Sequence, residues 1–377
     1  MTGNIMGRLF TVTSFGESHG PCVGALIDGC PAGLPLSREE IQEELNLRRP
    51  GRATIYSGRG EPDEVEILSG LFEGHTTGAP LCMLVRNRGV DSRPYEEFRR
   101  VPRPGHADYT ARIKYGGFGD WRGGGRFSGR ITASYVMAGA VAKKLLSFTL
   151  GVEVLAYTTQ IGRVKARKIP PERAKELRYS NDARCPDSEA AERMIKEIEG
   201  AMREGDSLGG IVECIVLNVP PGLGEPVFSS LESDLSRALL SIPAVKGVEF
   251  GHGFRLAGMR GSESNDPFAL KGRKVVTLTN KMGGILGGIS SGMPIVLRLV
   301  VKPTSSIRKR QRSVDLERME EAEITVTGRH DPCIVPRAVP VVESMVANVL
   351  ADHALQSGLI PPVLRAREDA RGREEVE

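Results

Sequence analysis

The sequence predicts a mixed α/β fold, more specifically of the α+β class. Antiparallel sheets are expected to pack on helices, and the two halves of the chain are expected to be similar. Strand-like apolar runs follow one another too closely for regular parallel βαβ crossovers, so antiparallel pairing is expected. Apolar residues recur at helical spacing over 131–148 and over 338–355, so each half should contribute a long helix. Several motifs recur in the same order in both halves, which indicates an internal duplication.

The clearest repeat joins residues 74–85 (GHTTGAPLCMLV) to residues 288–300 (GISSGMPIVLRLV). Both segments place a glycine, two hydroxyl residues, a second glycine and a proline at the same spacing before a strand. A second repeat of strand, Pro-x-Gly-Leu turn and helix joins residues 23–45 to residues 209–241. We therefore expect a single domain over 1–363, made of two halves at about 1–165 and 205–363, followed by a charged tail over 364–377.

Local patterns define the individual elements. Ser37 precedes the run REEIQEELNLR, and Glu40 follows it by three residues, so a helix that begins with a capping box is expected. Asp187 or Ser188 is expected to cap the next amphipathic helix. The polar, proline-containing stretch 165–186 should be an excursion from the core. Strands are expected at 8–15, 22–29, 65–70, 80–87 and 152–164.

Composition bounds the class of protein. With 377 residues, 40% of them hydrophobic and 26% charged, the chain has the composition of an ordinary soluble globular protein. The net charge is only +4 and the charges are interleaved, which argues against a dedicated nucleic-acid-binding protein but allows a local basic pocket. There is no run of 18 apolar residues and no signal-peptide core, so no membrane span is expected. Six scattered cysteines without CxxC spacing indicate reduced thiols in a cytoplasmic protein.

The stretch 116–129 (GGFGDWRGGGRFSG) contains seven glycines, the only tryptophan, and Arg122 and Arg126. Glycine lets backbone N–H groups approach a ligand closely, and a Gly/Arg loop before a helix suits an anion. A flexible surface loop is the alternative, although a linker would favour Ser and Gly over Arg and Trp.

Three of the six histidines, His19, His106 and His330, lie in glycine-flanked breaks between periodic elements. A loop histidine is a candidate proton donor because it titrates near neutral pH; an ordinary surface or capping histidine is the alternative for each. No HxxxH or HExxH pair occurs, so metal binding is not expected. Ser18 beside His19 is not a GxSxG elbow, so a hydrolytic triad is not supported.

A phosphate site is indicated at Lys302-Pro-Thr-Ser-Ser306, which directly follows a strand. Its hydroxyls, N–H groups and cation suit a phosphate, with an ST turn as the alternative. RHDPC (329–333) concentrates charge before the second long helix, whereas RKRQR (308–312) is expected to be a solvated loop or a lid. The standard nucleotide motifs are missing. Together these segments predict a cationic, hydroxyl-rich pocket for a phosphorylated polyanion.

Eight motifs resemble those of the chorismate synthase family, in family order and over nearly the whole chain. They are GESHG (16–20), RPGHADYT (103–110), GDWRGGGR (119–126), PPGLGEPVF (220–228), AVKGVEFG (244–251), GGILGGISSG (283–292), KPTSSI (302–307) and GRHDPC (328–333).

This resemblance implies conversion of 5-enolpyruvylshikimate 3-phosphate to chorismate and phosphate, the last common step of aromatic amino-acid biosynthesis in the shikimate pathway. The reaction is a 1,4-anti elimination by a carbon–oxygen lyase, and it needs reduced FMN without net redox change. NADPH is a further cofactor only where the enzyme reduces its own flavin. The family fold is a β-α-β sandwich, with helices layered between antiparallel sheets and an internal pseudo-twofold axis. The family is usually a homotetramer.

The resemblance also implies roles for individual residues. His19 would protonate the departing phosphate, and His106 would stabilise the anionic reduced flavin. Asp331, assisted by Ser18 and Ser128, would manage the proton at flavin N5. Arg48 matches a position assigned to NADPH or the substrate phosphate, and Arg52 and Arg130 are assigned to the same group. The positions that match FMN-binding residues are Arg126, Phe127, Ser128, Pro243, Ala244, Gly287, Lys302, Pro303, Thr304, Ser305, Ser306 and Arg329.

The chain departs from the family pattern at two positions. Phe127 stands where many relatives have Ser, which removes a hydroxyl contact to FMN. Thr54 stands where a second arginine often follows Arg48, and Arg52 or Arg59 would replace it. No NADPH module is visible, which favours an external supply of reduced flavin.

Two other classes of protein compete with this interpretation. One is an FMN-dependent enzyme that reduces its substrate. The other is a nucleic-acid-binding protein that uses the basic loops. Dispersed acidic residues and an aromatic content of 5% argue against the second class.

Overall fold

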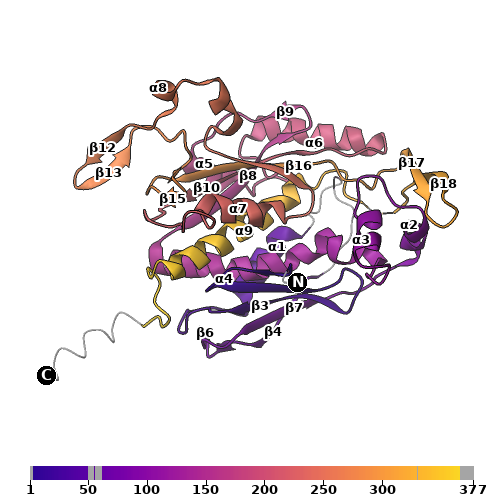
Figure 1. Cartoon of the computed structure of the whole chain (residues 1–377), viewed down its shortest axis with the longest axis horizontal. Helices are drawn as coiled ribbons and strands as arrows, with labels where there is room; N and C mark the ends of the chain where they lie inside the picture. Colours follow the sequence, from indigo (N-terminus) through magenta and orange to yellow (C-terminus); the bar gives the residue numbers. More distant parts are fainter. Residues whose placement is uncertain (1–2, 50–54, 56–61, 329, 366–377) are drawn as a thin grey trace.

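The structure is a computed structural model, and it describes residues 3–49, 55, 62–328 and 330–365. Two five-stranded antiparallel sheets enclose a layer of helices (Figure 1). The first sheet has the order β1-β2-β3-β7-β4, formed by Ile5–Met6, Thr11–Gly16, Cys22–Asp28, Leu81–Arg86 and Val65–Ser69. The second has the order β11-β16-β10-β8-β9, formed by Val245–Phe250, Ile295–Val301, Gly210–Leu217, Glu153–Ile161 and Val164–Lys165. The expected β-α-β sandwich is confirmed.

The middle layer contains α1 (Arg38–Arg48), α4 (Thr132–Leu150), α7 (Leu231–Leu240) and α9 (Val335–Gln356). The expected capping box begins α1, because the Ser37 side chain accepts from the Glu40 N–H and the Glu40 side chain accepts from the Ser37 N–H. α4 ends at Gly151, whose φ of 67° lies in the left-handed region that glycine adopts without strain. α4 and α9 run side by side through the centre of the molecule (Figure 1).

Strand pairing repeats between the two sheets. The order β2-β3-β7-β4 matches β8-β10-β16-β11, and all of these pairs are antiparallel. In each half the second matched strand is followed by a helix, the other two matched strands and a long helix, and β9, α5 and α6 are inserted between β8 and β10 of the second half. The hairpins β5–β6 (Leu71–Phe72 and His75–Thr76) and β14–β15 (Ile285–Leu286 and Ile289–Ser290) precede β7 and β16 respectively. The internal duplication is therefore confirmed.

The residue bounds of the two halves stay a prediction. β8 pairs with β10 and β9 pairs with β8, so both strands belong to the second sheet. This pairing favours a second half that begins near Glu153, earlier than the expected break at 165–205.

A buried charge network joins the central helices to the second sheet. Glu343 of α9 is fully buried, and its carboxylate accepts hydrogen bonds from the Ala156 N–H (2.9 Å), Arg178 Nε (3.1 Å) and the Tyr179 hydroxyl (3.1 Å). Lys143 Nζ of α4 lies 3.3 Å from the same carboxylate. Burial opposes ionisation, but Lys143 and Arg178 hold the pKa of Glu343 below its usual value. The partners thus offset the cost of burying the charge.

The basic run 308–312 differs from the expectation of a solvated loop. Arg310–Asp315 form β17, which pairs with β18 (Glu320–Thr325). Arg312 lies opposite Glu323 in this register, and Arg310 forms an ion pair with Glu323. Cross-strand charge pairs of this kind stabilise a hairpin, so the acidic strand explains why the basic segment is extended.

The remaining elements lie at the ends and edges of the sandwich. Asp187 caps α6, as one of the two alternatives predicted. α9 is long and apolar enough to cross a membrane by length and composition, but 94% of its most apolar window is buried inside the protein, which is the arrangement of a core helix. The other elements are α2 (Glu96–Arg100), α3 (Asp108–Lys114), α5 (Pro171–Leu177), α6 (Ser188–Arg203), α8 (Gly261–Ser264), β12 (Phe268–Lys271), β13 (Lys274–Thr277) and the 3₁₀ turns η1 (Arg93–Tyr95), η2 (Arg122–Phe127), η3 (Gly129–Ile131) and η4 (Gly253–Gly258).

Candidate active site

A cavity of about 1710 Å³ is lined by residues of both halves of the chain. Its walls come from the end of β2, the glycine-rich stretch, α3, the C-terminal end of α7, the segment after β16 and the first turn of α9. Among its described lining residues, ten Lys and Arg face six Asp and Glu. The excess of cations suits an anionic ligand, as the sequence predicts.

The glycine-rich stretch separates two of the candidate histidines. Gly123 and Gly124 have φ values of 59° and 81°, which only glycine adopts readily. A β-carbon at Gly124 would lie 3.5 Å from His106 Cε1, and one at Gly123 would lie 2.2 Å from His19 Cδ2. Glycine is needed at 123 because the backbone closely approaches the His19 imidazole, and at 124 because of its positive φ.

His106 lines the cavity and belongs to a compact charge cluster. Its Nδ1 lies 2.7 Å from Asp108 Oδ1, and Arg103 Nη2 lies 2.8 Å from the same oxygen. Burial of Asp108 opposes ionisation, but the hydrogen bonds from Arg103 and His106 hold the pKa of that carboxyl well below its usual value. Asp108 is therefore a carboxylate throughout the physiological range.

The segment after β16 lies against the loop that carries His106. Lys302 Nζ donates to Ser305 Oγ (2.8 Å) and to the Gly105 carbonyl (3.2 Å). Burial and the neighbouring charge of Lys246 lower the pKa of Lys302. Two lysines that repel each other beside hydroxyl groups form a place where a phosphate would relieve the repulsion.

Asp331 lines the cavity at the start of α9 and is largely buried. Its Oδ2 accepts a hydrogen bond from Arg337 Nη1 at 2.5 Å, and its carbonyl accepts one from Thr304 Oγ1 at 3.2 Å. The carboxylate is therefore fixed next to the Lys302–Ser306 segment.

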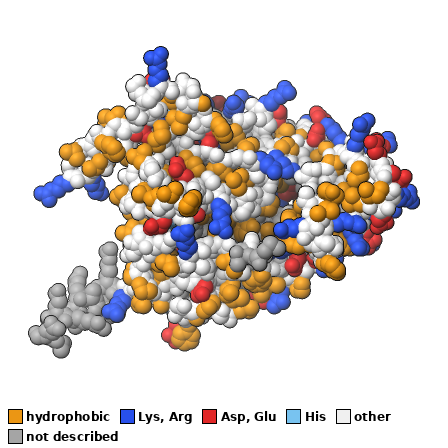
Figure 2. All heavy atoms as spheres, viewed as in Figure 1, with side chains coloured by type: hydrophobic (Ala, Val, Ile, Leu, Met, Phe, Trp, Pro, Cys, Tyr) orange, Lys and Arg blue, Asp and Glu red, His pale blue; other side chains and the backbone are white. Residues whose placement is uncertain are grey.

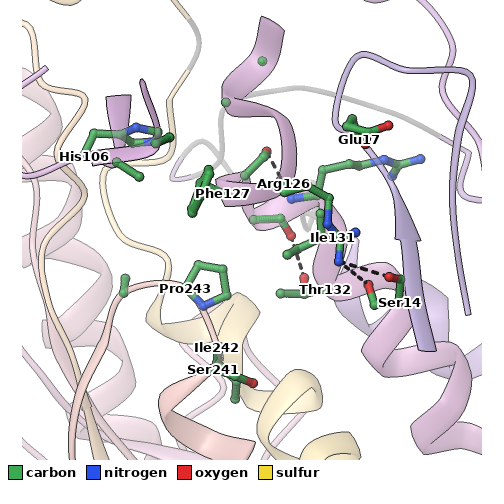
Figure 3. Close-up of a pocket in the computed structure, with 18 of the residues that line it drawn as sticks. Ser14, Glu17, His106, Arg126, Phe127, Ile131, Thr132, Ser241, Ile242 and Pro243 are labelled. Atoms are coloured by element: carbon green, nitrogen blue, oxygen red, sulfur yellow. Dashed lines mark hydrogen bonds between the residues drawn. The ribbon is translucent and has the colours of Figure 1, made fainter. Parts of the chain in front are cut away.

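Figure 3 shows His106 on one side of the cavity, Arg126 and Ser14 on the other, and Phe127 between them. The guanidinium of Arg126 donates to the Gly16 carbonyl (2.9 Å) and to the carbonyl of Ser14 (3.1 Å). These bonds direct its charge to the end of β2. The Phe127 ring is 39% exposed and offers an apolar face to a ligand.

Arg48 and Arg130 meet at one carboxylate. Arg48 Nη1 lies 3.1 Å from Asp63 Oδ2, and Arg130 Nη1 pairs with Asp63 Oδ1. Arg48 also donates to Thr132 Oγ1 (2.9 Å) and to the Gly129 carbonyl (3.0 Å). All three charged side chains are almost fully buried, so this cluster holds α1, residue 63 and the start of α4 together beside the cavity.

The comparisons with known proteins agree with this geometry. A family model described as chorismate synthase matches residues 10–355. The chain belongs to the chorismate synthase family. It is 58% identical, over 95% of its length and 99% of the relative's, to the chorismate synthase of Korarchaeum cryptofilum (strain OPF8). It is 55% identical, over 96% of each chain, to that of Methanothermobacter thermautotrophicus (strain Delta H). The resemblance found in the motifs is confirmed.

A solved structure supports the family fold. The chain superposes on a crystal structure of chorismate synthase with a TM-score of 0.75 and 33% identity, covering 93% of both chains.

The structure brings most of the residues predicted for a chorismate synthase site to one cavity. The predicted residues that line it are Arg48, His106, Arg126, Phe127, Ser128, Arg130, Pro243, Ala244, Lys302, Thr304, Ser305, Ser306 and Asp331. Arg52 and Arg329 lie outside the described residues, as do Thr54 and Arg59.

Ser18 and His19 lie just behind the cavity wall. Both are buried, and His19 Nδ1 lies 2.9 Å from Ser92 Oγ. The Ser18 N–H donates to the Gly125 carbonyl (3.3 Å), so the two residues support the glycine-rich stretch from behind. Their proposed roles in chemistry stay predictions.

Pro303 and Gly287 are not among the lining residues. Gly287 follows β14, and its neighbour Gly288 lies against Ser230, the N-cap of α7. The C-terminal end of α7 lines the cavity. Because α7 has ten residues, its two ends lie about 15 Å apart. The flavin contacts expected at Gly287 and Pro303 therefore stay predictions.

Arg103, Asp108 and Arg337 are among the charged residues of the cavity that were not predicted from the sequence. Arg103 and Asp108 flank His106 in the motif RPGHADYT, and a carboxylate two residues after a loop histidine could have been noticed. Arg337 is a cation in the first turn of a long apolar helix, six residues after Asp331. Within the described residues, no group of three or more His, Cys, Asp or Glu could hold a metal ion.

Proposed function

We propose that this protein converts 5-enolpyruvylshikimate 3-phosphate to chorismate and phosphate by a 1,4-anti elimination, as a carbon–oxygen lyase that uses reduced FMN. The observation that carries the proposal is that six of the eight family motifs contribute residues to one cationic cavity, in a chain that matches the family model over residues 10–355. The substrate bears two carboxylates and a phosphate, which the excess of Lys and Arg side chains would neutralise.

The size of the cavity supports two ligands. Pockets for one small molecule typically measure about 300–1,000 Å³, and this cavity measures about 1710 Å³. FMN fits the residues present, because Lys302, Ser305 and Thr304 suit its phosphate and the exposed Phe127 suits its ring. When bound, reduced FMN would lend electron density to the substrate and take it back.

The chain's own residues would position the ligands and move protons. His106 lies at the cavity wall where it can hold or release a proton at an imidazole nitrogen. Asp331, next to the Lys302–Ser306 segment, would accept or return a proton, and His19 would protonate the departing phosphate once the glycine-rich stretch admits it. Exclusion of water and oxygen from the reduced flavin would be a further contribution of the protein.

The supply of reduced flavin is a further part of the proposal. No separate NADPH-binding module is recognisable in the sequence, so an external source of reduced flavin is favoured over reduction by this protein. The proposed setting is the cytoplasm. A small-molecule substrate is the proposed partner, without nucleic acid or membrane.

A homotetramer completes the proposal. The arm formed by β12 and β13 stands out from the body of the molecule (Figure 1), and hydrophobic side chains gather on it, with Lys and Arg at its end (Figure 2). Phe268, Leu270 and Val275 share one face of this hairpin and are 68%, 77% and 62% exposed. An isolated two-stranded hairpin is marginally stable in water, and an exposed apolar patch marks an interaction site. A second copy of the chain would cover this face.

An anaerobic assay tests the reaction. Purified protein is mixed with chemically reduced FMN and 5-enolpyruvylshikimate 3-phosphate, and chorismate, phosphate and flavin redox state are followed together. Equal release of both products with the flavin still reduced supports the proposal. Oxidation of flavin in proportion to turnover would instead indicate an enzyme that reduces its substrate. A second assay with oxidised FMN and NADPH decides whether the protein reduces its own flavin.

A further inference from the structure

Asp108 is the centre of a hydrogen-bonded cluster that surrounds His106. Its carboxylate accepts three hydrogen bonds from Arg103, from the backbone N–H (3.0 Å), Nε (2.8 Å) and Nη2 (2.8 Å). It also lies 2.7 Å from His106 Nδ1. An ionised carboxylate can only accept hydrogen bonds, so the proton between these two residues belongs to Nδ1 of His106.

The protonation of Nδ1 determines which imidazole nitrogen can exchange a proton with a ligand. The Cε1–Nε2 edge of the ring faces Gly124, where a β-carbon would stand 3.5 Å from Cε1 and 3.7 Å from Nε2. Of the two ring nitrogens of His106, Nε2 is therefore the one that faces the cavity and can exchange a proton there. Arg103 Nη2 lies 3.0 Å from Nδ1 and 3.3 Å from Nε2. Because Nδ1 donates its proton to Asp108, Nε2 is the nitrogen that can accept a hydrogen bond or a proton.

Arg103 is itself held in place from several sides. Its side chain is 3% exposed, its guanidinium lies 4.4 Å above the Phe98 ring, and Nη1 donates to Ser306 Oγ at 3.2 Å. The positive charge of Arg103 balances the negative charge of Asp108, so the pair presents an oriented acceptor to His106 without a net charge. This arrangement orients an imidazole in the way that carboxylates orient histidines in metal sites and catalytic triads.

We propose that Asp108 and Arg103 are positioning residues, which fix His106 as the Nδ1–H tautomer and aim Nε2 into the cavity. The expected effect on turnover rests on the function proposed above. The tautomer of His106 is a property of the protein alone and does not depend on that function. The cluster also links the two halves of the chain. Ser306 accepts a hydrogen bond from the guanidinium of Arg103, which also donates to the carboxylate of Asp108.

The tautomer can be measured directly on the protein without flavin or substrate. Histidine-selective ¹⁵N labelling and two-bond ¹⁵N–¹H correlations distinguish Nδ1–H from Nε2–H, and the His106→Gln variant identifies the signals of His106. The expected result is a protonated Nδ1 in the wild-type protein. In Asp108→Asn, an amide oxygen in the place of Oδ2 would keep the bonds from the Arg103 N–H and Nε. An NH₂ in the place of Oδ1 would lose the bond from Nη2 and donate to Nδ1, so the proton is expected to move to Nε2.

Asp187 offers a matched control. Its carboxylate accepts from the same three donors of an arginine, the N–H (2.9 Å), Nε (3.1 Å) and Nη2 (3.0 Å) of Arg167. Among the described residues, no histidine is hydrogen-bonded to it. Asp187→Asn removes an equivalent carboxylate and is expected to leave the His106 signals unchanged. Turnover of Asp108→Asn should fall by about 10- to 100-fold, mainly in kcat, as for other residues that orient a functional histidine.

An unprotonated Nδ1 in the wild-type protein would overturn the proposal, and so would an unchanged tautomer in Asp108→Asn. The wild-type measurement decides the matter even if the variant does not fold. A protein that has the expected tautomer but forms no chorismate would contradict the proposed function and leave the positioning role intact.

Discussion

The backbone of Gly123 lies so close to His19 that a β-carbon on Gly123 would stand 2.2 Å from Cδ2 and 2.4 Å from Nε2 of the imidazole. No real β-carbon approaches a neighbour this closely, so the two groups cannot coexist if residue 123 has a side chain. The φ of 59° at Gly123 adds a further restriction. The position of the imidazole of His19 thus depends on a glycine more than one hundred residues later in the chain.

Gly123→Ala is therefore expected to displace His19 and to lower turnover by about 100-fold or more, the range associated with loss of a proton-transfer group. His19→Ala should cause a similar loss, and the double variant should be little worse than either single variant, because both remove the same group. Steady-state kinetics with reduced FMN measures all three variants.

Gly261→Ala is the matched control, because a β-carbon there meets nothing within 4 Å. Its activity should equal that of the wild-type protein. Near-normal turnover in both Gly123→Ala and His19→Ala would rule out a catalytic role for His19.

Removal of the Asp63 carboxylate should destabilise the protein strongly. Asp63→Ala would leave the guanidinium groups of Arg48 and Arg130 buried without their shared counter-ion, which typically costs about 3–5 kcal/mol. Urea denaturation followed by circular dichroism measures the change. Glu66→Ala is the control, because the Glu66–Arg86 pair is about half exposed and contributes little. Equal midpoints for the two variants would contradict the structural importance of the cluster.

Local features of this fold could be predicted from sequence, and long-range contacts could not. The capping box of Ser37 and Glu40 and the cap at Asp187 depend on residues that are neighbours in the chain. The extended form of residues 310–315 depends on pairing with an acidic strand, which the composition of the basic run does not reveal.

The same distinction holds for the candidate site. Motifs placed His106, Lys302 and Asp331 in one pocket, and the structure brings them to one cavity. The support of Asp63 for two arginines and the contact of Gly123 with His19 join residues far apart in sequence. The spacing of residues in a single sequence does not reveal such contacts, so the contacts were not predicted.

The exposed face of the β12–β13 arm leads to a prediction about assembly. Leu270→Glu places a charge on the apolar face formed with Phe268 and Val275, so it should shift the oligomer towards smaller species. Light scattering coupled to size-exclusion chromatography measures the mass. Lys271→Gln, next in the chain but on the opposite face of the hairpin, is expected to leave the mass unchanged. A wild-type protein that is monomeric at micromolar concentration would contradict the assignment of this face.

The buried cysteines lead to a prediction for alkaline pH. Burial raises the pKa of Cys30 to about 12, of Cys185 to about 11 and of Cys333 to about 12, above the ordinary value for a thiol. These pKa values are higher in the folded protein than in the unfolded chain. The contribution of the three neutral thiols to the free energy of unfolding is therefore complete below about pH 9 and is lost as pH rises from about 9 towards 12. Iodoacetamide at pH 8 should label the partly exposed Cys22 well before these three residues. Mass spectrometry of the peptides measures this order, and fast labelling of Cys30 in the folded protein would contradict it.

Substitution of glycine by alanine is expected to have opposite effects on stability at two helical positions. One is Gly139, where α4 crosses α9, and the other is Gly200 of α6. A β-carbon at Gly139 of α4 would lie 2.2 Å from Ser344 Cβ and 2.5 Å from Ser344 Cα of α9, so Gly139→Ala would force the helices apart. Overpacking of this kind typically costs about 1–3 kcal/mol. At Gly200 of α6 the only neighbour is the Arg203 guanidinium at 4.0 Å, so Gly200→Ala should stabilise the protein by about 0.5–1 kcal/mol through helix propensity. Urea denaturation of both variants tests the signs, and a stabilised Gly139→Ala protein would mean that the two central helices are not in close contact at this crossing.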